Sequence, residues 1–509
     1  MSEASEALQK IARGTGIVFA GTVISMFFGF LSRAIIARYF STGEYGVFNL
    51  ALTVLSIALV VATLGFQNAL PREVAFYKER EPSRVRDLIS TALIIVALNS
   101  IIWTVILILG AGNVAQVFNE ERLAYALKIV AFALPFSALI GTIVSISRGF
   151  GRVREKVYFQ NIVYPTAFLV FIALGAFLNF PFTYVFFAYV LAQVLTFLAL
   201  TFDVWRIKLF EFRTSLDLRL GRELIVFSLP LLFTGILGFV MTWADTLMLG
   251  YYKSSEVVGL YNTASPIARL LPIFLNSAAF LYAPIASQLY AQEKLGELKR
   301  VYQILTKWVF LLTLPIFSVM FLFPEATIGF FFGVKYTSAA PALRILALGF
   351  MFHTFLGLNG MSLTVIGQPK LNMIGNSFAV IFNIVLNLLL IPKYGMVGAA
   401  VATAVSYFVA NVFRSFWLYQ KTKIHPFSWN YVKPLVISFV LLGLIQSLHL
   451  RVPNIWYAIP ILVIFLGVYF FLVLLSRSVD KEDVELLLAI EKRVGVNLGI
   501  IKKVLRRFV

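Results

Sequence analysis

The sequence predicts an all-α polytopic membrane protein with about 14 transmembrane helices. Of its 509 residues, 60% are hydrophobic and only 13% are charged. The apolar residues fall in blocks of roughly twenty, separated by short polar segments. A bilayer core requires about 20 apolar residues in a helix, because each residue adds about 1.5 Å of length. Blocks of this length therefore indicate membrane spans.

Fourteen blocks qualify as spans, and polar residues interrupt the seventh, eighth and tenth of them. The expected spans lie near residues 14–37, 46–70, 88–111, 123–147, 157–179, 182–204, 223–251, 258–287, 303–324, 338–366, 371–391, 395–419, 431–449 and 454–475. The first block follows two Glu residues and has no small-residue cleavage site, so we expect a retained helix rather than a signal peptide.

The basic residues orient the chain. Of the 43 Lys and Arg, 33 fall on one side of the predicted spans and eight on the other, while Arg33 and Arg269 lie deep within spans. The positive-inside rule places the richer side in the cytoplasm. We therefore expect a multi-pass protein of the cell membrane with both termini cytoplasmic. The net charge of +19 then reflects contact with anionic membrane lipids rather than with nucleic acid.

A short internal repeat divides the chain. The segments "STGEYGVFNLA" (41–51) and "SSEVVGLYNTA" (254–264) follow the first and the seventh span, 213 residues apart. They are identical at Ser41/Ser254, Gly46/Gly259, Asn49/Asn262 and Ala51/Ala264. Because six spans separate the copies, the repeats run parallel.

This repeat predicts two parallel six-helix bundles, at 1–210 and 211–420, around a central cavity. Two additional transmembrane helices follow at 421–476. Residues 477–509 form a cytoplasmic segment whose end has the pattern of a basic amphipathic helix. We expect this helix to lie on the inner leaflet, and a regulatory or partner-binding role is the alternative.

Several kinds of site are not expected. The chain has no cysteine, and its three histidines lie far apart, so we expect neither a metal site nor a cofactor. His353 fits a hydrogen-bonded packing residue, and Glu325, beside Pro324, an interfacial one. The loops are too short for a soluble catalytic domain, and the six aspartates form no DxD motif, so we expect no enzyme.

Two charges inside spans are candidate functional residues. Arg33, in "GFLSRAIIARYF", either snorkels to the outer interface near Arg38 or faces a water-filled cavity. Asp245, in "MTWADTLMLGYY", has a stem too short to snorkel. Under the repeat it corresponds to Ser32, so it either pairs with Arg33 or titrates during ion coupling, unless it only makes a structural hydrogen bond.

Four further residues are candidate substrate ligands. Arg269, between Pro266 and Pro272, either binds a phosphate bidentately or neutralises Asp245 or a backbone carbonyl. Arg72 stands at the inner mouth, where it guides an anion inward or simply follows the positive-inside rule. The matched Asn49 and Asn262 favour hydrogen bonds between helices.

Four stretches carry a family resemblance. They are "RAIIARYFSTGEYGVFNLALTVLSI", "SRGFGRVREKVYFQ", "ADTLMLGYYKSSEVVGLYNTA" and "VIGQPKLNMIGN". The chain resembles the polysaccharide transporter branch of the MOP superfamily, which includes the Wzx-type flippases. That branch is related to the lipid II flippases and to the MATE exporters. The likeness covers nearly the whole chain, most clearly through about residue 420.

The resemblance implies a flippase that moves a lipid-linked oligosaccharide to the outer leaflet by alternating access. A basic cavity would hold the phosphate or pyrophosphate, and glycan-assembly proteins are further expected partners. The first helix, "GFLSRAIIAR", departs from the lipid II flippase pattern, because Ser32 stands in place of its arginine and Arg33 in place of its acidic residue. Asp245 resembles an aspartate common in the seventh span of the branch.

Two other functions compete with this one. A MATE-like exporter of drugs or cations would favour acidic cavity residues, whereas the deep charges here are mainly basic. A membrane-embedded glycan polymerase or transferase would favour acidic pairs or a large outer loop.

Overall fold

The computed structural model describes residues 3–210, 216–448, 450, 452, 454–480 and 482–483. Within these ranges every regular element is a helix. The chain divides into two compact units, which we describe separately. Unit 1 comprises Met1–Asn262 and Asn387–Ala399, and unit 2 comprises Thr263–Leu386 and Ala400–Val509. These borders differ from the six-helix halves expected from the repeat, which stay a prediction.

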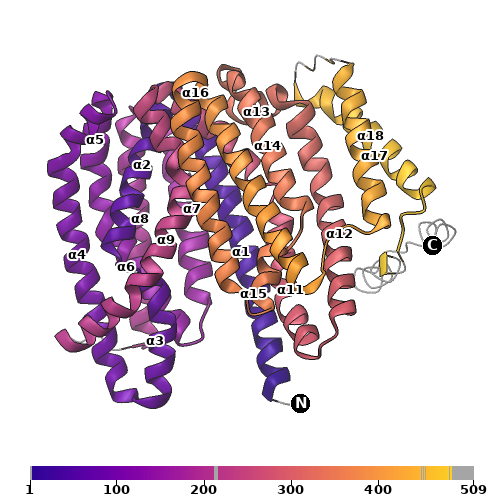
Figure 1. Cartoon of the computed structure of the whole chain (residues 1–509). Helices are drawn as coiled ribbons and strands as arrows, with labels where there is room; N and C mark the ends of the chain where they lie inside the picture. Colours follow the sequence, from indigo (N-terminus) through magenta and orange to yellow (C-terminus); the bar gives the residue numbers. More distant parts are fainter. Residues whose placement is uncertain are drawn as a thin grey trace. The chain divides into compact units, whose positions relative to one another are not determined.

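Unit 1 consists mainly of long helices that run side by side (Figure 1). Its helices are α1 (Glu3–Tyr39), α2 (Thr42–Ala62), α3 (Phe66–Arg80), α4 (Pro82–Val117), α5 (Glu121–Val130), the short η1 (Ala131–Ala133), α6 (Leu134–Gly149), the π-helical η2 (Lys156–Val163), α7 (Tyr164–Phe177), α8 (Thr183–Arg206) and α9 (Leu218–Tyr252).

Unit 2 has the same all-helical character, and two helices contribute residues to both units. Its own helices are α11 (Ile273–Ala291), α12 (Leu295–Leu322), α13 (Pro324–Phe332), the short η3 (Val334–Ala339), α14 (Ala340–Phe355), α15 (Asn359–Val365), α17 (Trp429–Ser447) and α18 (Ile455–Leu475). The two shared helices are α10 (Ser255–Ala268) and α16 (Pro369–Thr422).

The predicted fold class is confirmed, since 12 helical stretches of the described residues are long and apolar enough to cross a membrane. The expected number of fourteen spans stays a prediction. Two local features explain why it differs from the 12 stretches. The 54 residues of α16 form one stretch, yet Gly395 has a non-helical backbone with φ 54°, which divides it near the expected boundary at 391–395. The expected span 258–287 is interrupted between α10 and α11, at residues 269–272, which end with Pro272.

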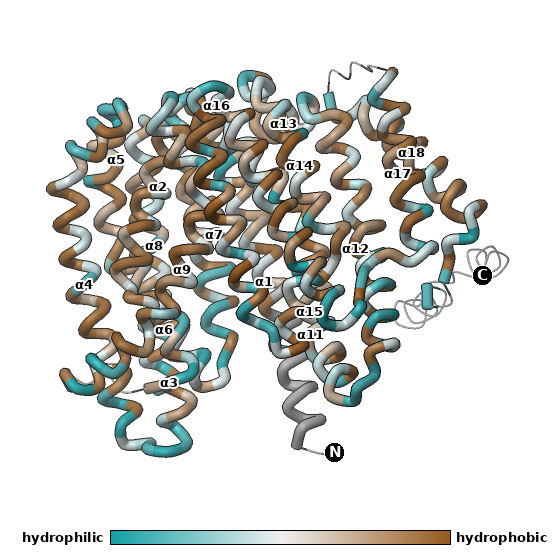
Figure 2. Tube along the Cα trace, in the orientation of Figure 1, coloured by the Kyte–Doolittle hydropathy of each residue, from teal (hydrophilic) through white to brown (hydrophobic). Residues whose placement is uncertain are grey.

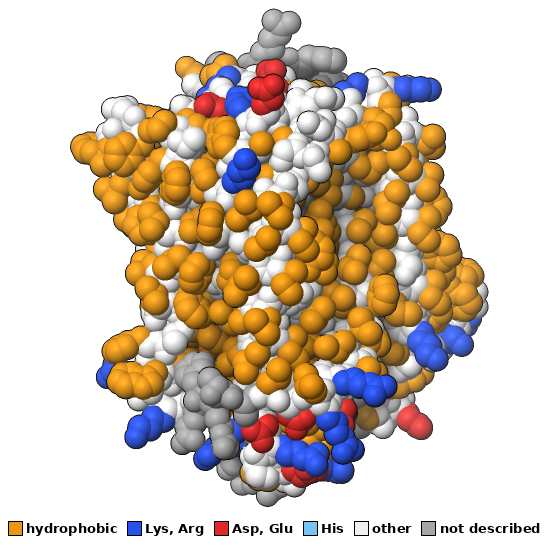
Figure 3. Space-filling model, turned by 90° about the vertical axis from the view of Figure 1, so that its left-hand side faces the viewer, with side chains coloured by type: hydrophobic (Ala, Val, Ile, Leu, Met, Phe, Trp, Pro, Cys, Tyr) orange, Lys and Arg blue, Asp and Glu red, His pale blue; other side chains and the backbone are white. Residues whose placement is uncertain are grey.

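The distribution of polar residues matches a bilayer environment. In both units the middles of the long helices are hydrophobic, while hydrophilic residues concentrate towards their ends (Figure 2). On the face shown in Figure 3, hydrophobic side chains cover the middle, and Lys, Arg, Asp and Glu gather mostly at the two ends. A continuous apolar band with charged ends is typical of a multi-pass membrane protein.

The core of unit 1 positions α9 against the first helices of the chain. Buried apolar residues of α3, α4, α6, α8 and α9 form one cluster. α9 packs against α2, α3 and α4. The turn between α2 and α3 contains Gly65, with φ 76°, where a Cβ atom would lie 2.8 Å from the carbonyl oxygen of Ser228 in α9. Only glycine permits both this backbone and this close approach.

In unit 2 an ionic cluster holds the chain beyond α18 against α12. Lys307, buried in α12, forms ion pairs with Asp480 and Asp483, and the Asp483 contact measures 2.6 Å. Arg300 pairs with Asp480 and Glu482, each at 2.8 Å. The expected amphipathic helix at the end of segment 477–509 lies outside the described residues, as does His449.

Candidate functional site

The repeat segments begin α2 and α10 in equivalent ways. Ser41 caps α2 through a capping box, in which its hydroxyl accepts from Glu44 N while the Glu44 carboxylate accepts from Ser41 N. At the start of α10 the Ser254 hydroxyl accepts from Val257 N at 3.4 Å. The matched serines therefore satisfy free backbone donors at two helix N-termini.

A chain of hydrogen bonds joins α2, α10 and α9 inside unit 1. The Tyr45 hydroxyl donates to the backbone carbonyl of Asn262 at 3.2 Å. Asn262 Nδ2 donates to Thr246 Oγ1 of α9 at 3.2 Å, so this asparagine does bond across helices. Its repeat partner Asn49 donates at 2.7 Å to Tyr45 O of its own helix. Both asparagines are buried, and only Asn262 links helices directly through its side chain.

Asp245 lies next to these hydrogen bonds and accepts hydrogen bonds from two neutral side chains. The Tyr261 hydroxyl donates to Asp245 Oδ2 at 2.5 Å, and Asn387 Nδ2 donates to Oδ1 at 2.7 Å. The carboxyl group is only 5% exposed. Three helices, α9, α10 and α16, thus meet at one carboxylate. A buried carboxyl group needs such hydrogen-bond donors, because burying a polar group without partners is costly.

Arg33 does not form the ion pair with Asp245 that one of the sequence hypotheses proposed. The described residues contribute no carboxylate to an ion pair with Arg33, which is half-buried on α1. Its electrostatic neighbours are the phenols of Tyr45 and Tyr164. Asp245 is instead hydrogen-bonded by Tyr261 and Asn387. The spacing of the repeat placed Arg33 and Asp245 at similar heights but did not fix which way each side chain points.

The other predicted ligands lie in separate places. On α3, Arg72 is well exposed, forms an ion pair with Glu73, and has its guanidinium carbon 4.7 Å from the centre of the Phe227 ring. In unit 2, Arg269 Nε donates to Ser265 Oγ at 3.2 Å, at the break between α10 and α11. These geometries leave the roles of both arginines in substrate binding as predictions.

Sequence reasoning missed two residues that complete the polar site. Tyr261 and Asn387 both hydrogen-bond Asp245. The signal for Asn387 was present in "NIVLNLLLIP", because a buried amide in a membrane span needs a partner just as a charge does. Tyr261 gave a weaker signal, since a tyrosine also fits the apolar face of a helix.

A second polar cluster lies in unit 2 and gives His353 its partner. Asn411 Oδ1 is 3.0 Å from His353 Nδ1, and Asn359 Nδ2 donates to the same oxygen at 3.1 Å. His353 thus has the hydrogen bond expected of a packing histidine. Glu325 is exposed in the first turn of α13. In the described part of the chain no three His, Cys, Asp or Glu residues group as metal ligands would.

Comparison with known families decides the relationship of the chain. Residues 11–290, more than half of its length, match the family model described as polysaccharide biosynthesis protein. The chain belongs to this family. A second model, MatE, matches residues 230–389 of this chain, which confirms its membership of the MOP superfamily.

Individual relatives are similar to this chain over part of their length. An uncharacterized membrane protein of Methanocaldococcus jannaschii is 32% identical over 225 residues, which cover 41% of this chain and 43% of the relative. The probable low-salt glycan biosynthesis flippase Agl15 of Haloferax volcanii is 29% identical over 227 residues, or 44% and 48% of the two chains. The chain spans less than half the length of these two relatives.

Solved structures support the fold over most of this chain. The lipid II flippase MurJ in an inward closed conformation aligns with a TM-score of 0.72 at 16% identity, covering 91% of this chain and 98% of that one. An inward-facing multidrug resistance transporter of the MATE family aligns with a TM-score of 0.64 at 14% identity, covering 78% and 94%. At these identities the likeness concerns the fold.

Proposed function

We propose that this protein is a flippase that moves a lipid-linked oligosaccharide across the cytoplasmic membrane by alternating access. Both termini would lie in the cytoplasm, following the distribution of Lys and Arg. Glycan-assembly proteins would be its partners on either side of the transport step. The similarity to a probable glycan biosynthesis flippase, together with the flippase-like fold, supports transport of a glycan precursor rather than catalysis.

The observation that carries the proposal is the environment of Arg33. This guanidinium lies within a membrane span and forms no ion pair with a carboxylate of the described residues. An arginine in a span is costly unless a polar group, water or an anion compensates its charge. The phosphate or pyrophosphate of a lipid-linked glycan is such an anion, and the fork of guanidinium donors matches its oxygens.

Asp245 supplies the second element of the proposed mechanism. A buried carboxylate that three helices share is suited to couple its charge state to helix positions. Uptake of a proton or a metal cation at Asp245 would alter its bonds with Tyr261 and Asn387. We therefore keep ion coupling as its proposed role, with Arg269, Arg72, Asn49 and Asn262 as further proposed contacts of the head group.

Transport in proteoliposomes tests the proposal. The assay measures how much fluorescent lipid-linked oligosaccharide becomes accessible to a membrane-impermeant quencher or glycosidase. We expect Arg33→Ala to reduce the transport rate by about 100-fold or more, since a charge-assisted contact with phosphate is lost, and Arg33→Lys to retain part of it. Arg38→Ala is the matched control, because Arg38 lies exposed on the same helix.

Two outcomes would contradict the proposal. Equal transport by the parent and by correctly folded Arg33→Ala would show that Arg33 only snorkels to the interface. The flippase function itself would be contradicted if neither the parent nor the Arg38→Ala control transported any of several lipid-linked glycans. Folding is checked by size-exclusion chromatography and by thermal melting of each variant.

A multidrug or cation exporter is the second candidate function. The MatE match at residues 230–389 includes Asp245, and a buried carboxylate is the type of residue that binds a cation. The same proteoliposomes loaded with ethidium distinguish the two functions. Proton-driven ethidium export that Asp245→Asn abolishes and Arg33→Ala spares would favour the exporter.

A further inference from the structure

A groove opens in unit 2 between α12, the last turns of α16 and the linker 423–428, which joins α16 to α17. Its volume is about 310 Å³, at the lower end of the range of ligand-binding pockets. Tyr302 of α12 is buried in its lining, whereas Phe416, Tyr419 and Phe427 line it and are exposed. The groove is therefore a mainly apolar, aromatic surface that a partner can cover.

Hydrogen bonds hold the walls of this groove in place. Gln303 Nε2 of α12 donates to the backbone oxygens of His425 and Phe427 in the linker, at 3.2 and 3.4 Å. The hydroxyl of the adjacent Tyr302 donates to Leu356 O, at the end of α14, at 2.7 Å. The groove is thus preformed, and a ligand that fills it does not have to order the linker first.

The acidic segment after α18 brings the chain to this groove. Asn430, in the first turn of α17, donates to Asp480 Oδ1 at 2.9 Å. Trp308 Nε1 donates to Asp483 Oδ1 at 2.6 Å. Tyr302, which lines the groove, precedes Trp308 on α12 by six residues, or about 9 Å. Asp483 is the last residue that the structure describes, so the remainder of the chain starts close to the groove.

The sequence after Asp483 predicts a helix with one apolar face. In "VELLLAIEKRV", residues 484–494, the apolar side chains that fall on one face of an α-helix are Leu486, Leu487, Ile490 and Val494. Glu485 and Lys492 fall on the opposite face. An isolated helix of this length is marginal in water, so its apolar face needs a surface to cover.

Reach and charge favour this segment as the occupant of the groove. Leu487 follows Asp483 by four residues, which span at most about 14 Å of extended chain. A segment tethered this closely has an effective concentration of about millimolar at the groove. Lys423 of the linker has its Nζ 5.0 Å from the centre of the Tyr419 ring. Glu491, one helical turn after Leu487, supplies the opposite charge beside the apolar face.

The basic end of the chain suits the groove less well. Its apolar residues alternate with the cations Lys502, Lys503, Arg506 and Arg507. The linker beside the groove already carries Lys423, and Lys299 acts electrostatically on His425 of the same linker. Like charges placed together are unfavourable. The anionic inner leaflet, as expected from the sequence, suits this basic end better.

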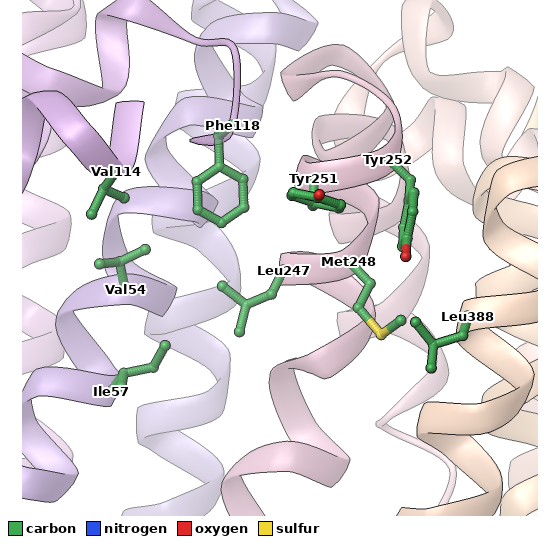
Figure 4. A pocket seen from close by; sticks show the side chains of 9 residues that line it. All are labelled: Val54, Ile57, Val114, Phe118, Leu247, Met248, Tyr251, Tyr252 and Leu388. Atoms are coloured by element: carbon green, nitrogen blue, oxygen red, sulfur yellow. The ribbon is translucent and has the colours of Figure 1, made fainter. Parts of the chain in front are cut away.

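A second groove, on unit 1, offers no comparable candidate. Its volume is about 480 Å³, and Figure 4 shows its side chains converging from α2, α4, α9 and α16. Its lining residues lie far along the sequence from either end of the described chain, and no contact among the described residues indicates its occupant.

We propose that residues 484–494 dock into the groove of unit 2 as an amphipathic helix. The docked helix fastens the end of the chain to α12, α16 and the linker, and it does so whatever the transported substrate is. The competing occupants are the basic end at 500–508, a second copy of this chain and a lipid chain.

Disulfide cross-linking of the full-length protein in membranes tests the proposal. The chain has no cysteine, so each introduced pair reports a single contact. We expect Tyr419→Cys with Leu487→Cys to form a disulfide within one chain on mild oxidation. Its rate should exceed that of Leu312→Cys with Leu487→Cys at least about tenfold, because Leu312 is exposed on α12 but lies outside the groove. Phe427→Cys is a second groove position, in the linker, for use where Tyr419→Cys does not fold.

Two variants of the tail test which face docks. Ile490→Glu places a charge in the apolar face, so the disulfide between positions 419 and 487 should form about tenfold more slowly. Lys492→Glu introduces the same side chain on the opposite face and should leave the rate unchanged. Neither variant alters a residue of the groove, so a slower rate reflects lost docking rather than a damaged groove.

Several results would overturn the proposal. Equal rates for the Leu312→Cys and Tyr419→Cys pairs, or an unchanged rate in Ile490→Glu, would show that the apolar face does not dock. A faster reaction from Phe508→Cys than from Leu487→Cys would assign the groove to the basic end.

Two further results would assign the groove to another molecule. Disulfides that form only between chains would indicate a second copy, and a disulfide that forms only after detergent removes the lipid would indicate a lipid chain. Cross-linking is read without transport. Failure of the flippase function with cross-linking retained would therefore refute the proposed function and leave the docked tail.

Discussion

Gly46 of α2 and Gly259 of α10 lie where these two helices cross, and they are matched positions of the internal repeat. A Cβ atom on Gly46 would lie 1.6 Å from Ser255 O and 3.1 Å from Gly259 N. A Cβ atom on Gly259 would lie 2.1 Å from Thr42 O and 3.1 Å from Gly46 N. The backbones therefore touch reciprocally, as small residues permit between membrane helices.

Replacement of either glycine is expected to separate the two helices. The methyl group of Gly46→Ala would overlap the carbonyl oxygen of Ser255, so the backbone must shift to admit it. We expect the free energy of unfolding to fall by about 1–3 kcal/mol. Thermal melting in detergent measures the change. Gly110→Ala is the control, because its Cβ would meet no atom within 4 Å. An unchanged melting temperature for Gly46→Ala would contradict the tight crossing.

The hydrogen bond from Tyr261 to Asp245 makes a prediction about coupling. Asp245→Asn cannot ionise, so we expect it to abolish the dependence of transport on an imposed proton or sodium gradient. Tyr261→Phe removes one donor and leaves the carboxylate, so transport should persist at a rate about tenfold lower. A gradient dependence equal to the parent's in Asp245→Asn would assign this residue a purely structural role.

The ionic cluster of unit 2 is expected to stabilise the fold. Lys307 is 1% exposed, and Lys307→Met leaves the buried Asp480 and the partly buried Asp483 without this cation. We expect the free energy of unfolding to fall by about 3 kcal/mol. This value is at the low end for a broken buried ion pair, because Arg300 still pairs with Asp480. Lys294→Met is the matched control on an exposed pair with Glu297 and should cost less than about 1 kcal/mol. Equal losses would contradict this role.

The same cluster predicts a weakening in acid. Burial opposes ionisation of Asp480, but hydrogen bonds from Lys307, Asn430 and Arg300 outweigh it and hold the pKa of Asp480 below its ordinary value. The hydrogen bond from Arg300 likewise lowers the pKa of Glu482. A lowered pKa contributes stability above the unfolded value, near pH 4, that is lost as the pH falls through the folded value.

Hydrogen exchange measures this acid effect directly. Amide protection of the segment that joins α18 to residue 480 should decrease as the pH falls below about 4. In Asp480→Asn the protection should be weaker at neutral pH and should change less with acid. Protection that rises on acidification in the parent would contradict the sign of both pKa shifts.

Several features of the site were predictable from the sequence because they depend on local cost. A charge in an apolar run is expensive wherever it points, which singled out Arg33 and Asp245. The repeat identified Asn262, which does bond across helices. The suggested Arg33–Asp245 ion pair was not found, because side-chain direction depends on helix rotation, which equal height in the membrane does not specify.

The sequence by itself determined the membrane class, the approximate spans and the family, since a bilayer imposes a required length and polarity on each helix. Only the tertiary structure decided which residues meet. Two partners of Asp245, Tyr261 and Asn387, are 16 and 142 residues away along the chain. Periodicity within one span shows how polar each face is, but close packing of several helices decides which faces touch.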